Sequence, residues 1–377
     1  MKIIVLGGGL VGGVIARDLK TDFDVTIADN SKQKLKILKN NFLLKTIFAD
    51  LSNQSSIKKI VKNFDLVIGA VPGHLGFNLL KSVIEAKKNI VDISFFPEDA
   101  FKLDKLAKKN KVIAIVDSGI APGGNNLIIG YHYSKMERLK NVECYVGGLP
   151  LLREPPFEYK IVFSVVDVIE EYTRPSRIIK NGKLIIKDAL SDIELHDFQN
   201  IGLIESFNTD GLRTLLKTIK AKNIKEKTLR YPGHAQKMKI LSDAGLFSKK
   251  EVLINGKLIR PLDLTVKLLL PKWKLKSREE DLTIMRVIVD GIETSKLVRY
   301  QYDLFDRFDK NKNITSMART TGYFCSTVAR LIAKKLYNKT GISPLEYIGA
   351  NEKCFNFIFD QLSKKKINFE VKKINLV

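Results

Sequence analysis

Three kinds of sequence feature are scarce or missing in this 377-residue chain. It has only three cysteines, Cys144, Cys325 and Cys354, which lie far apart and form no C-x-x-C pair. That pattern fits a reducing compartment such as the cytoplasm and argues against a structural zinc site. No apolar run approaches the roughly 18 residues that a membrane span requires, and no tract is of low complexity. We therefore expect a globular, cytoplasmic protein with no metal site and no membrane partner.

Acidic residues are outnumbered by basic ones, and the formal net charge is +23. A protein that binds nucleic acid usually clusters its Lys and Arg with interleaved aromatics, or carries a known module. Here the excess is mostly lysine, spread along the chain in Lys- and Asn-rich segments such as 53–63 and 102–111. These segments predict solvated surface and no specific nucleic-acid partner. Weak polyanion binding, or attraction of anionic ligands, is the alternative.

The most informative feature present is the amino-terminal stretch, which begins with a β-branched apolar run at 2–6. A G-x-G-x-x-G motif and a helical pattern follow it. In a dinucleotide-binding turn the first glycine allows the tight turn, the second lets the backbone approach the pyrophosphate, and the third allows close packing of helix on strand. A second β-branched run ends in a carboxylate about 20 residues later, suited to the adenosine ribose. The candidate cofactor residues here are Gly7, Gly9, Leu10, Val11, Gly12 and Asp29.

The alternation of strand and helix continues to residue 116, which predicts βαβ units and a doubly wound parallel sheet of the α/β class. Strands are expected at 45–49, 65–70, 89–93 and 112–116, and helices at 31–40, 55–63, 79–87 and 101–108. Ligands of such sheets lie off the carboxyl ends of the strands. Further cofactor candidates at those ends are Asp50, Leu51, Ala70, Val71 and Pro72, and Ser94 is a substrate candidate.

The chain is longer than one hydrophobic core usually serves, so we expect two domains. After residue 120 the sequence is β-rich, and Asn-Gly or Asp-Gly pairs at 181–182, 255–256 and 290–291 favour hairpin turns. Helices are expected at 159–172, 209–219 and 261–270. We predict a dinucleotide domain at 1–120, completed by 316–377, and an α+β, mostly antiparallel substrate domain at 121–315.

Candidate substrate and catalytic residues lie in three segments. Asp117, in DSGIAPGG, is either a carboxylate facing a substrate amine or a cap for a helix that begins near Gly124. Thr209, before a predicted helix, either caps that helix or holds substrate. Arg230 is placed to bind a substrate carboxylate through two hydrogen bonds, with a structural arginine as the alternative. His234 follows in the same turn and is a candidate proton acceptor beside Asp117, or a structural histidine.

Motifs along nearly the whole chain make it similar to the saccharopine dehydrogenase-like reductases, particularly their lysine 6-dehydrogenase branch. The matching segments are GGGLVG at 7–12, AVPG at 70–73, VDIS at 91–94, DSGIAPG at 117–123, YVGGLP at 145–150, EEYTRP at 170–175, NTDGLRTLL at 208–216, KTLRYPGH at 227–234 and SMARTTGY at 316–323. The resemblance implies a Rossmann domain and an α/β substrate domain with the active site between them. It also implies that Thr209, Arg230 and Tyr231 border the substrate, and that the protein forms at least a homodimer.

The resemblance implies NAD-dependent oxidation of the ε-amine of L-lysine to 2-aminoadipate 6-semialdehyde, which cyclises to the piperideine. The related chemistry of saccharopine or carboxynorspermidine is the alternative, and a non-catalytic dinucleotide-binding protein is a third. In the first case Arg230, helped by Arg213, anchors the α-carboxylate. Asp29 favours NAD over NADP because a carboxylate repels a 2′-phosphate, although NADP is allowed by the nearby lysines.

Overall fold

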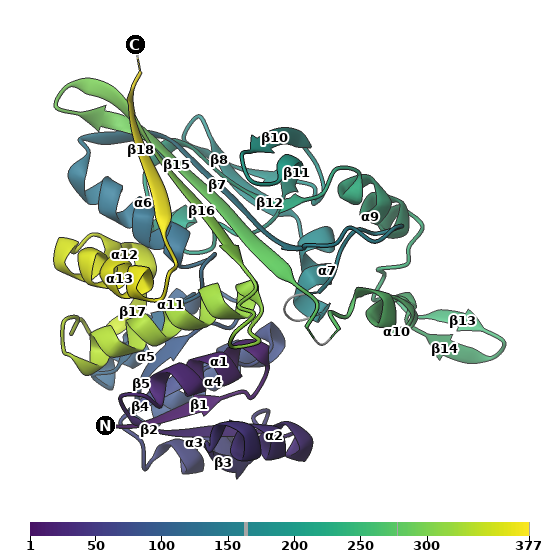
Figure 1. Cartoon of the computed structure of the whole chain (residues 1–377), viewed down its shortest axis with the longest axis vertical. Coiled ribbons are helices and arrows are strands. Elements are labelled where there is room, and N and C mark those ends of the chain that lie inside the picture. The colour runs from purple at the N-terminus through teal and green to yellow at the C-terminus, as the bar shows by residue number, and fades with distance from the viewer. Residues whose placement is uncertain (162–164, 277, 377) are drawn as a thin grey trace. The chain divides into compact units, whose positions relative to one another are not determined.

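The structure is a computed structural model that describes residues 1–161, 165–276 and 278–376. The chain divides into two compact units, and each of them draws on three separate stretches of sequence (Figure 1). Unit 1 comprises Met1–Arg138, Arg213–Ile219 and Ala318–Asn368. Unit 2 comprises Leu139–Leu212, Lys220–Met317 and Phe369–Val377.

Unit 1 is built on a seven-stranded sheet in which every pair of neighbours is parallel. Its order is β17-β6-β5-β4-β1-β2-β3, so the chain winds outward in one direction from β1 and in the other from β4. The strands are β1 (Lys2–Leu6), β2 (Asp24–Asp29), β3 (Lys45–Phe48), β4 (Leu66–Gly69), β5 (Asn89–Asp92), β6 (Ile113–Val116) and β17 (Gly341–Pro344). This order confirms the predicted doubly wound α/β class, and it places a switch point between β1 and β4.

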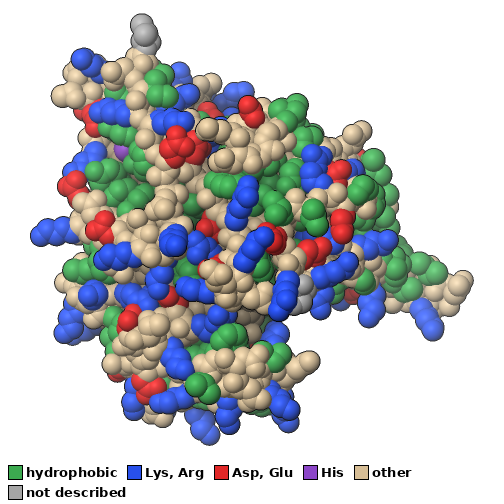
Figure 2. Space-filling view, in the orientation of Figure 1, with side chains coloured by type: hydrophobic (Ala, Val, Ile, Leu, Met, Phe, Trp, Pro, Cys, Tyr) green, Lys and Arg blue, Asp and Glu red, His purple; other side chains and the backbone are tan. Residues whose placement is uncertain are grey.

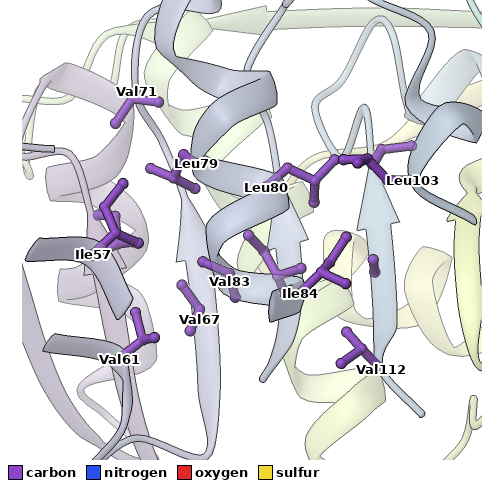
Figure 3. Packing of buried hydrophobic residues seen from close by; sticks show 14 of the residues in the cluster. Ile57, Val61, Val67, Val71, Leu79, Leu80, Val83, Ile84, Leu103 and Val112 are labelled. Atoms are coloured by element: carbon purple, nitrogen blue, oxygen red, sulfur yellow. The ribbon is translucent and has the colours of Figure 1, made fainter. Parts of the chain in front are cut away.

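Helices cover this sheet because its strands are apolar on both faces, as the fully buried run Ile3–Leu6 shows. The helices of unit 1 are α1 (Leu10–Leu19), α2 (Lys32–Phe42), α3 (Gln54–Val61), α4 (Gly73–Glu85), η1 (Ala100–Leu103), α5 (Asp104–Lys109), α6 (Gly124–Lys135), α8 (Leu215–Thr218), α11 (Ser316–Ala333), α12 (Leu345–Gly349) and α13 (Glu352–Lys364). Figure 3 shows α4 turning Leu79, Val83 and Ile84 toward the sheet, near Val67 of β4. The side chain of Ser31 accepts the Lys34 N–H and so caps α2, as its position in the sequence indicates.

Unit 2 is built on a nine-stranded mixed sheet. Most pairs are antiparallel, and β12 pairs with β7 in parallel. The strands are β7 (Arg138–Pro150), β8 (Ser176–Lys180), β9 (Lys183–Lys187), β10 (Glu194–Phe198), β11 (Gly202–Asn208), β12 (Ala221–Arg230), β15 (Asp281–Glu293), β16 (Lys296–Arg307) and β18 (Phe369–Asn375), with a separate hairpin of β13 (Val252–Ile254) and β14 (Lys257–Ile259). The helices are α7 (Val165–Thr173), α9 (His234–Asp243) and α10 (Pro261–Trp273).

Two of the three predicted hairpin turns are confirmed. Asn181-Gly182 joins β8 to β9 and Asn255-Gly256 joins β13 to β14, with positive φ at all four residues. The third prediction is wrong, because Asp290-Gly291 lies inside β15 and the chain turns at Thr294-Ser295. There Asp290 is buried and binds Arg299 of β16 through two hydrogen bonds. The twelve-residue ladder between β15 and β16 therefore outweighs the local turn preference.

Two helices predicted within the range 121–315 are shorter than expected. In the segment 209–219 only Leu215–Thr218 is helical, because Thr209 and Gly211 both bind Glu226 of β12 and are held out of a helix. In the segment 159–172, α7 begins at Val165, and residues 162–164 lie outside the described part of the chain. Sequence patterns did not indicate α9, α13 or β18.

The units differ from the expected ranges in three places. Residues 121–138, including α6, lie in unit 1, and so does the short segment Arg213–Ile219. The last strand, β18, pairs with β16 in unit 2, so it does not join the parallel sheet as the range 316–377 implied. Within the described residues, no helix has the length and apolar character needed to cross a bilayer.

Candidate dinucleotide and substrate sites

The glycine turn of unit 1 has the close contacts that each glycine permits. Gly7 has φ of +116°, and a Cβ there would lie 2.1 Å from the carbonyl oxygen of Ala70. A Cβ at Gly12 would lie 2.0 Å from the Gly7 carbonyl oxygen, so α1 packs against the turn only because both residues are glycine. A Cβ at Gly9, in contrast, would meet nothing within 4 Å. Gly9 is the N-cap of α1, so the open space lies at the helix start, where an anion is favoured.

Asp29 joins the end of β2 to this turn. Its Oδ2 accepts the Gly8 N–H at 2.7 Å and its Oδ1 accepts the Ser31 N–H at 2.8 Å. The carboxylate therefore has a defined position at the carboxyl end of its strand, where a ribose hydroxyl is bound in dinucleotide folds. Gly8, which the motif treats as a variable position, supplies the donor that orients it.

The remaining cofactor candidates follow β3 and β4. Asp50 accepts the N–H and the hydroxyl of Ser52, and these hydrogen bonds lower the pKa of its carboxyl. Leu51 and Val71 are buried in the core of unit 1, and Pro72 is the N-cap of α4. These residues lie at the same edge of the sheet as the glycine turn, because all its strands are parallel. The geometry fits a nicotinamide dinucleotide held by α1, Asp29 and the ends of β3 and β4.

Asp117 and Arg213, two substrate-site candidates, bind each other within unit 1. The Asp117 carboxylate accepts from Arg213 Nε at 3.0 Å and Nη2 at 2.9 Å, and Nη1 donates to the carbonyl of Phe96. The guanidinium also lies over the Phe95 ring, 4.8 Å from its centroid. Both members of the pair have positive φ, at 54° and 51°, a strained conformation for residues other than glycine. Asp117 therefore does not cap α6, and Arg213 already has a carboxylate partner.

Asp92, which the sequence did not single out, lies fully buried at the end of β5. It accepts the N–H of Ser94 at 2.9 Å and faces its hydroxyl at 3.1 Å, so the candidate Ser94 is bound by its own strand end. A Cβ at Gly69 would lie 1.9 Å from Asp92 Oδ2, so only glycine admits this carboxyl. Burial raises the pKa of Asp92 to about 8, despite the two hydrogen bonds.

Replacing Asp92 with asparagine is expected to stabilise the protein above about pH 4. Between pH 3.8 and about 8 the folded protein holds a proton on Asp92 that the unfolded chain releases. The wild-type protein, which carries the aspartate, therefore loses folding stability as pH rises through that window. The gain in melting temperature should grow from pH 4 to 8, by roughly 2–4 °C per kcal/mol. Asp50→Asn is the control, since its lowered pKa predicts no such gain. A difference between Asp92→Asn and wild type that does not vary with pH would contradict the assignment.

A buried polar cluster occupies unit 2 around Arg230. The guanidinium binds Glu171 at 2.7 Å and the Leu229 carbonyl at 2.9 Å, and it lies over the Tyr159 ring, 4.7 Å from its centroid. Tyr172 adds a hydrogen bond of 2.9 Å to Nε2 of His234. Burial raises the pKa of Glu171 and that of Tyr172. Glu171 and Tyr172 come from the segment EEY at 170–172, whose spacing alone assigns them no role.

Three donors in this cluster have no acceptor in hydrogen-bond geometry within the described residues: Tyr159 Oη, Arg230 Nε and Trp273 Nε1, although Tyr159 and Arg230 lie close enough to shift each other's pKa. They are neighbours, since the Tyr159 ring lies 5.5 Å from that of Trp273 and beneath the Arg230 guanidinium. Tyr159 also lines a pocket of about 200 Å³ that includes Lys160. A buried donor without an acceptor is costly. The cluster is therefore suited to an acceptor such as a carboxylate.

The other candidates of unit 2 are engaged within the unit. Burial, and then the charge of Arg230, lower the pKa of His234 to about 3, so this imidazole is neutral at physiological pH and a poor proton acceptor. Thr209 donates to Glu226 at 2.8 Å, and burial raises the pKa of Glu226 to about 8. Tyr231 is buried and donates to the Pro150 carbonyl at 2.9 Å.

Comparison with known proteins identifies both parts of the chain. Residues 3–115 match the saccharopine dehydrogenase NADP binding domain, and residues 119–367 match the saccharopine dehydrogenase C-terminal domain. The structure of saccharopine dehydrogenase (L-Glu forming) from Saccharomyces cerevisiae has the same fold, with a TM-score of 0.79, 19% identity and 99% coverage of both chains.

The curated relatives have low sequence identity to this chain, and the match covers only part of their length. Saccharopine dehydrogenase [NADP(+), L-glutamate-forming] of Pyricularia oryzae is 26% identical over 265 residues, which cover 66% of this chain and 59% of that protein. The mitochondrial alpha-aminoadipic semialdehyde synthase of Rattus norvegicus is 24% identical over 265 residues, or 29% of its length. The chain thus matches less than two thirds of the length of either relative. Because the domain matches span almost all of its own length, the chain belongs to the saccharopine dehydrogenase family.

Proposed function

We propose that the protein is a nicotinamide-dinucleotide-dependent dehydrogenase acting on a secondary amine that carries carboxylates, such as saccharopine. Some of the curated relatives, such as the Pyricularia oryzae protein, are named saccharopine dehydrogenase, and both domain matches carry that name, which favours this alternative over oxidation of the free ε-amine of lysine. The observation that carries the proposal is the set of three buried donors without an acceptor around Tyr159 and Arg230. Saccharopine has more carboxylates than lysine and so makes greater use of such donors.

The overall change joins oxidation of a C–N bond to its hydrolysis. A secondary amine, water and the oxidised dinucleotide become a primary amine, an aldehyde, the reduced dinucleotide and a proton. The nicotinamide ring, when bound, supplies the hydride acceptor. In unit 1 the N-terminus of α1 at Gly9 binds the pyrophosphate and Asp29 binds the ribose.

On the substrate side, Arg230 binds a carboxylate and fixes the position of an otherwise flexible molecule. For the proton we place Asp117 ahead of His234, because the burial of His234 disfavours its charged form. Arg213 would hold Asp117 in position through their ion pair. His234 in turn would hold Tyr172 through their hydrogen bond.

A substrate panel tests this proposal. Saccharopine, lysine and simple diamines are each offered with NAD and with NADP, and the absorbance of the reduced dinucleotide is followed. We expect kcat/KM for saccharopine to exceed that for lysine by at least about tenfold, equivalent to 1.4 kcal/mol. A higher value for lysine would instead support a lysine 6-dehydrogenase. Dinucleotide binding without turnover of any amine would support the non-catalytic alternative.

The choice between NAD and NADP depends on Asp29 in this proposal. Both carboxylate oxygens accept backbone N–H groups, so the charge is held at the ribose position and repels a 2′-phosphate. We expect NAD to have the higher kcat/KM, although the matched domain is described as NADP-binding. Asp29→Ser should shift the ratio toward NADP by about tenfold or more. A wild-type enzyme that prefers NADP tenfold would contradict this role of Asp29.

A further inference from the structure

A short stretch of unit 1 lies, in the sequence, between two parts of unit 2. Residues 213–219, here called the crossover segment, follow Leu212 and precede Lys220, and both of those residues belong to unit 2. The segment supplies Arg213, the partner of Asp117, and the single helical turn α8. It is not continuous with any strand of the parallel sheet. Contacts with residues distant in the sequence therefore have to hold it on unit 1.

Glu346 of α12 binds the crossover segment inside unit 1. The side chain is buried, and its Oε1 accepts the hydroxyl of Thr218 at 2.6 Å. Its Oε2 accepts from Nδ2 of Asn126, a residue of α6, at 3.0 Å. Both partners are uncharged, so these two hydrogen bonds hold the segment without an ion pair. Burial raises the pKa of the Glu346 carboxyl, which favours its neutral form.

Asn126 connects Glu346 to the loop between β6 and α6. Its Nδ2, which donates to Glu346, also lies 3.5 Å from Oγ1 of Thr214 in the crossover segment. Its Oδ1 accepts the Gly123 N–H at 3.2 Å, and Asn125 shares that donor at 2.9 Å. One buried amide therefore reaches both stretches of chain that supply the ion pair, the crossover segment and the loop after β6.

The helices that carry Asn126 and Glu346 pack with their backbones in contact, and Figure 1 shows α12 beside α6. A Cβ at Gly130 of α6 would lie 2.1 Å from the Glu346 carbonyl oxygen. A Cβ at Gly349 of α12 would lie 2.0 Å from the Leu127 carbonyl oxygen. Glycine at both positions permits this close approach. The backbone that carries the carboxyl is thus fixed relative to the backbone that carries the amide.

Arg213 and Asp117 need support from their surroundings because both have a strained backbone. Their φ angles of 51° and 54° lie in the left-handed region, which residues other than glycine seldom adopt. Such conformations persist only when the surrounding structure determines them. Both side chains are also buried, and a buried ion pair is favourable only when its geometry is good. A shift of either stretch would therefore cost the pair its hydrogen bonds.

We propose that Glu346 is a positioning residue, which acts with Asn126 to hold the Arg213 guanidinium on the Asp117 carboxylate. The consequence for catalysis rests on the proposed function, in which Asp117 handles the proton. Without the hydrogen bond from Thr218 to Glu346, the crossover segment shifts and the carboxylate loses its fixed orientation toward the reacting carbon. A displacement of about 1 Å at a reacting group can cost about a hundredfold in rate.

Steady-state kinetics with saccharopine test the proposal from both sides of one hydrogen bond. Glu346→Ala removes the acceptor and Thr218→Val removes the donor, and Thr218→Val carries the test where Glu346→Ala does not fold. We expect each to lower kcat about tenfold or more, while KM and the dinucleotide Kd change by less than about threefold. Glu346→Gln should restore kcat to near the wild-type value. Its amide oxygen can accept from Asn126 and its amide nitrogen can donate to the Thr218 hydroxyl.

Lys217→Ala is the matched control on the crossover segment. Lys217 forms an exposed ion pair with Asp99 at 2.5 Å, so this variant also removes a contact of the segment. Lys and Arg side chains are spread over the face of the molecule seen in Figure 2. An exposed pair in such surroundings contributes little to stability. We therefore expect kcat of Lys217→Ala to equal that of the wild type.

A double-mutant cycle measures the ion pair without any turnover. Asp117→Asn, Arg213→Met and the double variant are unfolded with denaturant, and the departure from additivity gives the coupling between the two side chains. The cycle is repeated in the Thr218→Val and Glu346→Gln backgrounds. We expect the coupling to be present in the wild type, to persist with Glu346→Gln and to be lost with Thr218→Val.

Several results would overturn the proposal. They are a wild type without coupling between Asp117 and Arg213, coupling or kcat that survives Thr218→Val, and loss of either in Glu346→Gln. The last result would show that the charge of Glu346 matters and that its hydrogen bonds do not. A wild type that turns over no amine would instead contradict the proposed function, and the cycles alone would then decide whether Glu346 holds the pair.

Discussion

Gly9→Ala is expected to weaken dinucleotide binding by about a hundredfold, equivalent to 2.8 kcal/mol, with no loss of stability. In the folded chain a Cβ at this position meets no atom within 4 Å, and the backbone has an ordinary φ of −72°. Alanine therefore fits the protein itself without strain. It would, however, fill the space through which the backbone and the N-terminus of α1 approach a pyrophosphate. Calorimetric titration with NAD and NADP, together with melting temperatures, measures both quantities.

Gly12→Ala is the matched control and should behave differently. Its Cβ would lie 2.0 Å from the Gly7 carbonyl oxygen, so α1 must move away from β1. We expect a lower melting temperature together with weaker binding. If Gly9→Ala binds the dinucleotide as tightly as the wild type, the glycine turn is not the pyrophosphate site, and the proposed redox function loses its basis.

Arg230→Met is expected to reduce both stability and substrate binding. It leaves the partly buried Glu171 carboxylate without its cation, which should cost less than the about 3–5 kcal/mol typical of breaking a fully buried pair. Loss of a charge-assisted pair with the substrate carboxylate should cost a further 1.5–3 kcal/mol of binding, or roughly a tenfold or larger rise in KM. Chemical denaturation and steady-state kinetics measure the two effects separately.

The double variant Arg230→Met/Glu171→Gln distinguishes anchoring from a purely structural role. Removing the buried negative charge as well should restore much of the lost stability, because no unpaired ion remains. Substrate binding should stay weak, since the guanidinium is still missing. Recovery of a wild-type KM in the double variant would show that Arg230 only supports the fold. An unchanged KM in Arg230→Met alone would also exclude the anchor.

The parallel sheet of unit 1 was predictable because the sequence patterns that specify its strands and helices are local. Its strands are short β-branched runs separated by helical patterns, and the contacts that they make repeat in every βαβ unit. Gly12 is required by a contact within the same turn, with the Gly7 carbonyl, whereas Gly7 also faces Ala70, which follows the neighbouring strand β4. The hairpin turns at 181–182 and 255–256 were also local, since the residues Asn-Gly accept positive φ at low cost.

Predictions failed where distant partners decide the conformation. Asp290-Gly291 has a turn sequence, but Arg299 and the long β15–β16 ladder hold it extended. Residues 209–219 have a helical pattern, but Glu226 of another strand binds Thr209 and Gly211. Such partners lie 9 to 17 positions away along the chain, outside any local window.

In the candidate site, too, residue types could be predicted from the sequence, whereas their partners could not. From the sequence alone, Asp117 and Arg213 were separate candidates for a base and an anchor, whereas the fold joins them in one ion pair across 96 positions. Likewise His234 had the residue type of a proton acceptor, and only its burial beside Arg230 and Tyr172 makes it neutral. Asp92 lies in the apolar strand predicted at 89–93, but spacing alone does not show that its carboxyl is enclosed beside Gly69, and Tyr159 belongs to no motif.

The sequence by itself determined the doubly wound sheet, the dinucleotide turn and the family, because each depends on residues close together in the chain or on whole motifs. Only the tertiary structure decided which charges are paired, which donors lack an acceptor and which side chains hold the crossover segment. Those properties depend on desolvation and on contacts between residues far apart in sequence, and neither is encoded by spacing or composition.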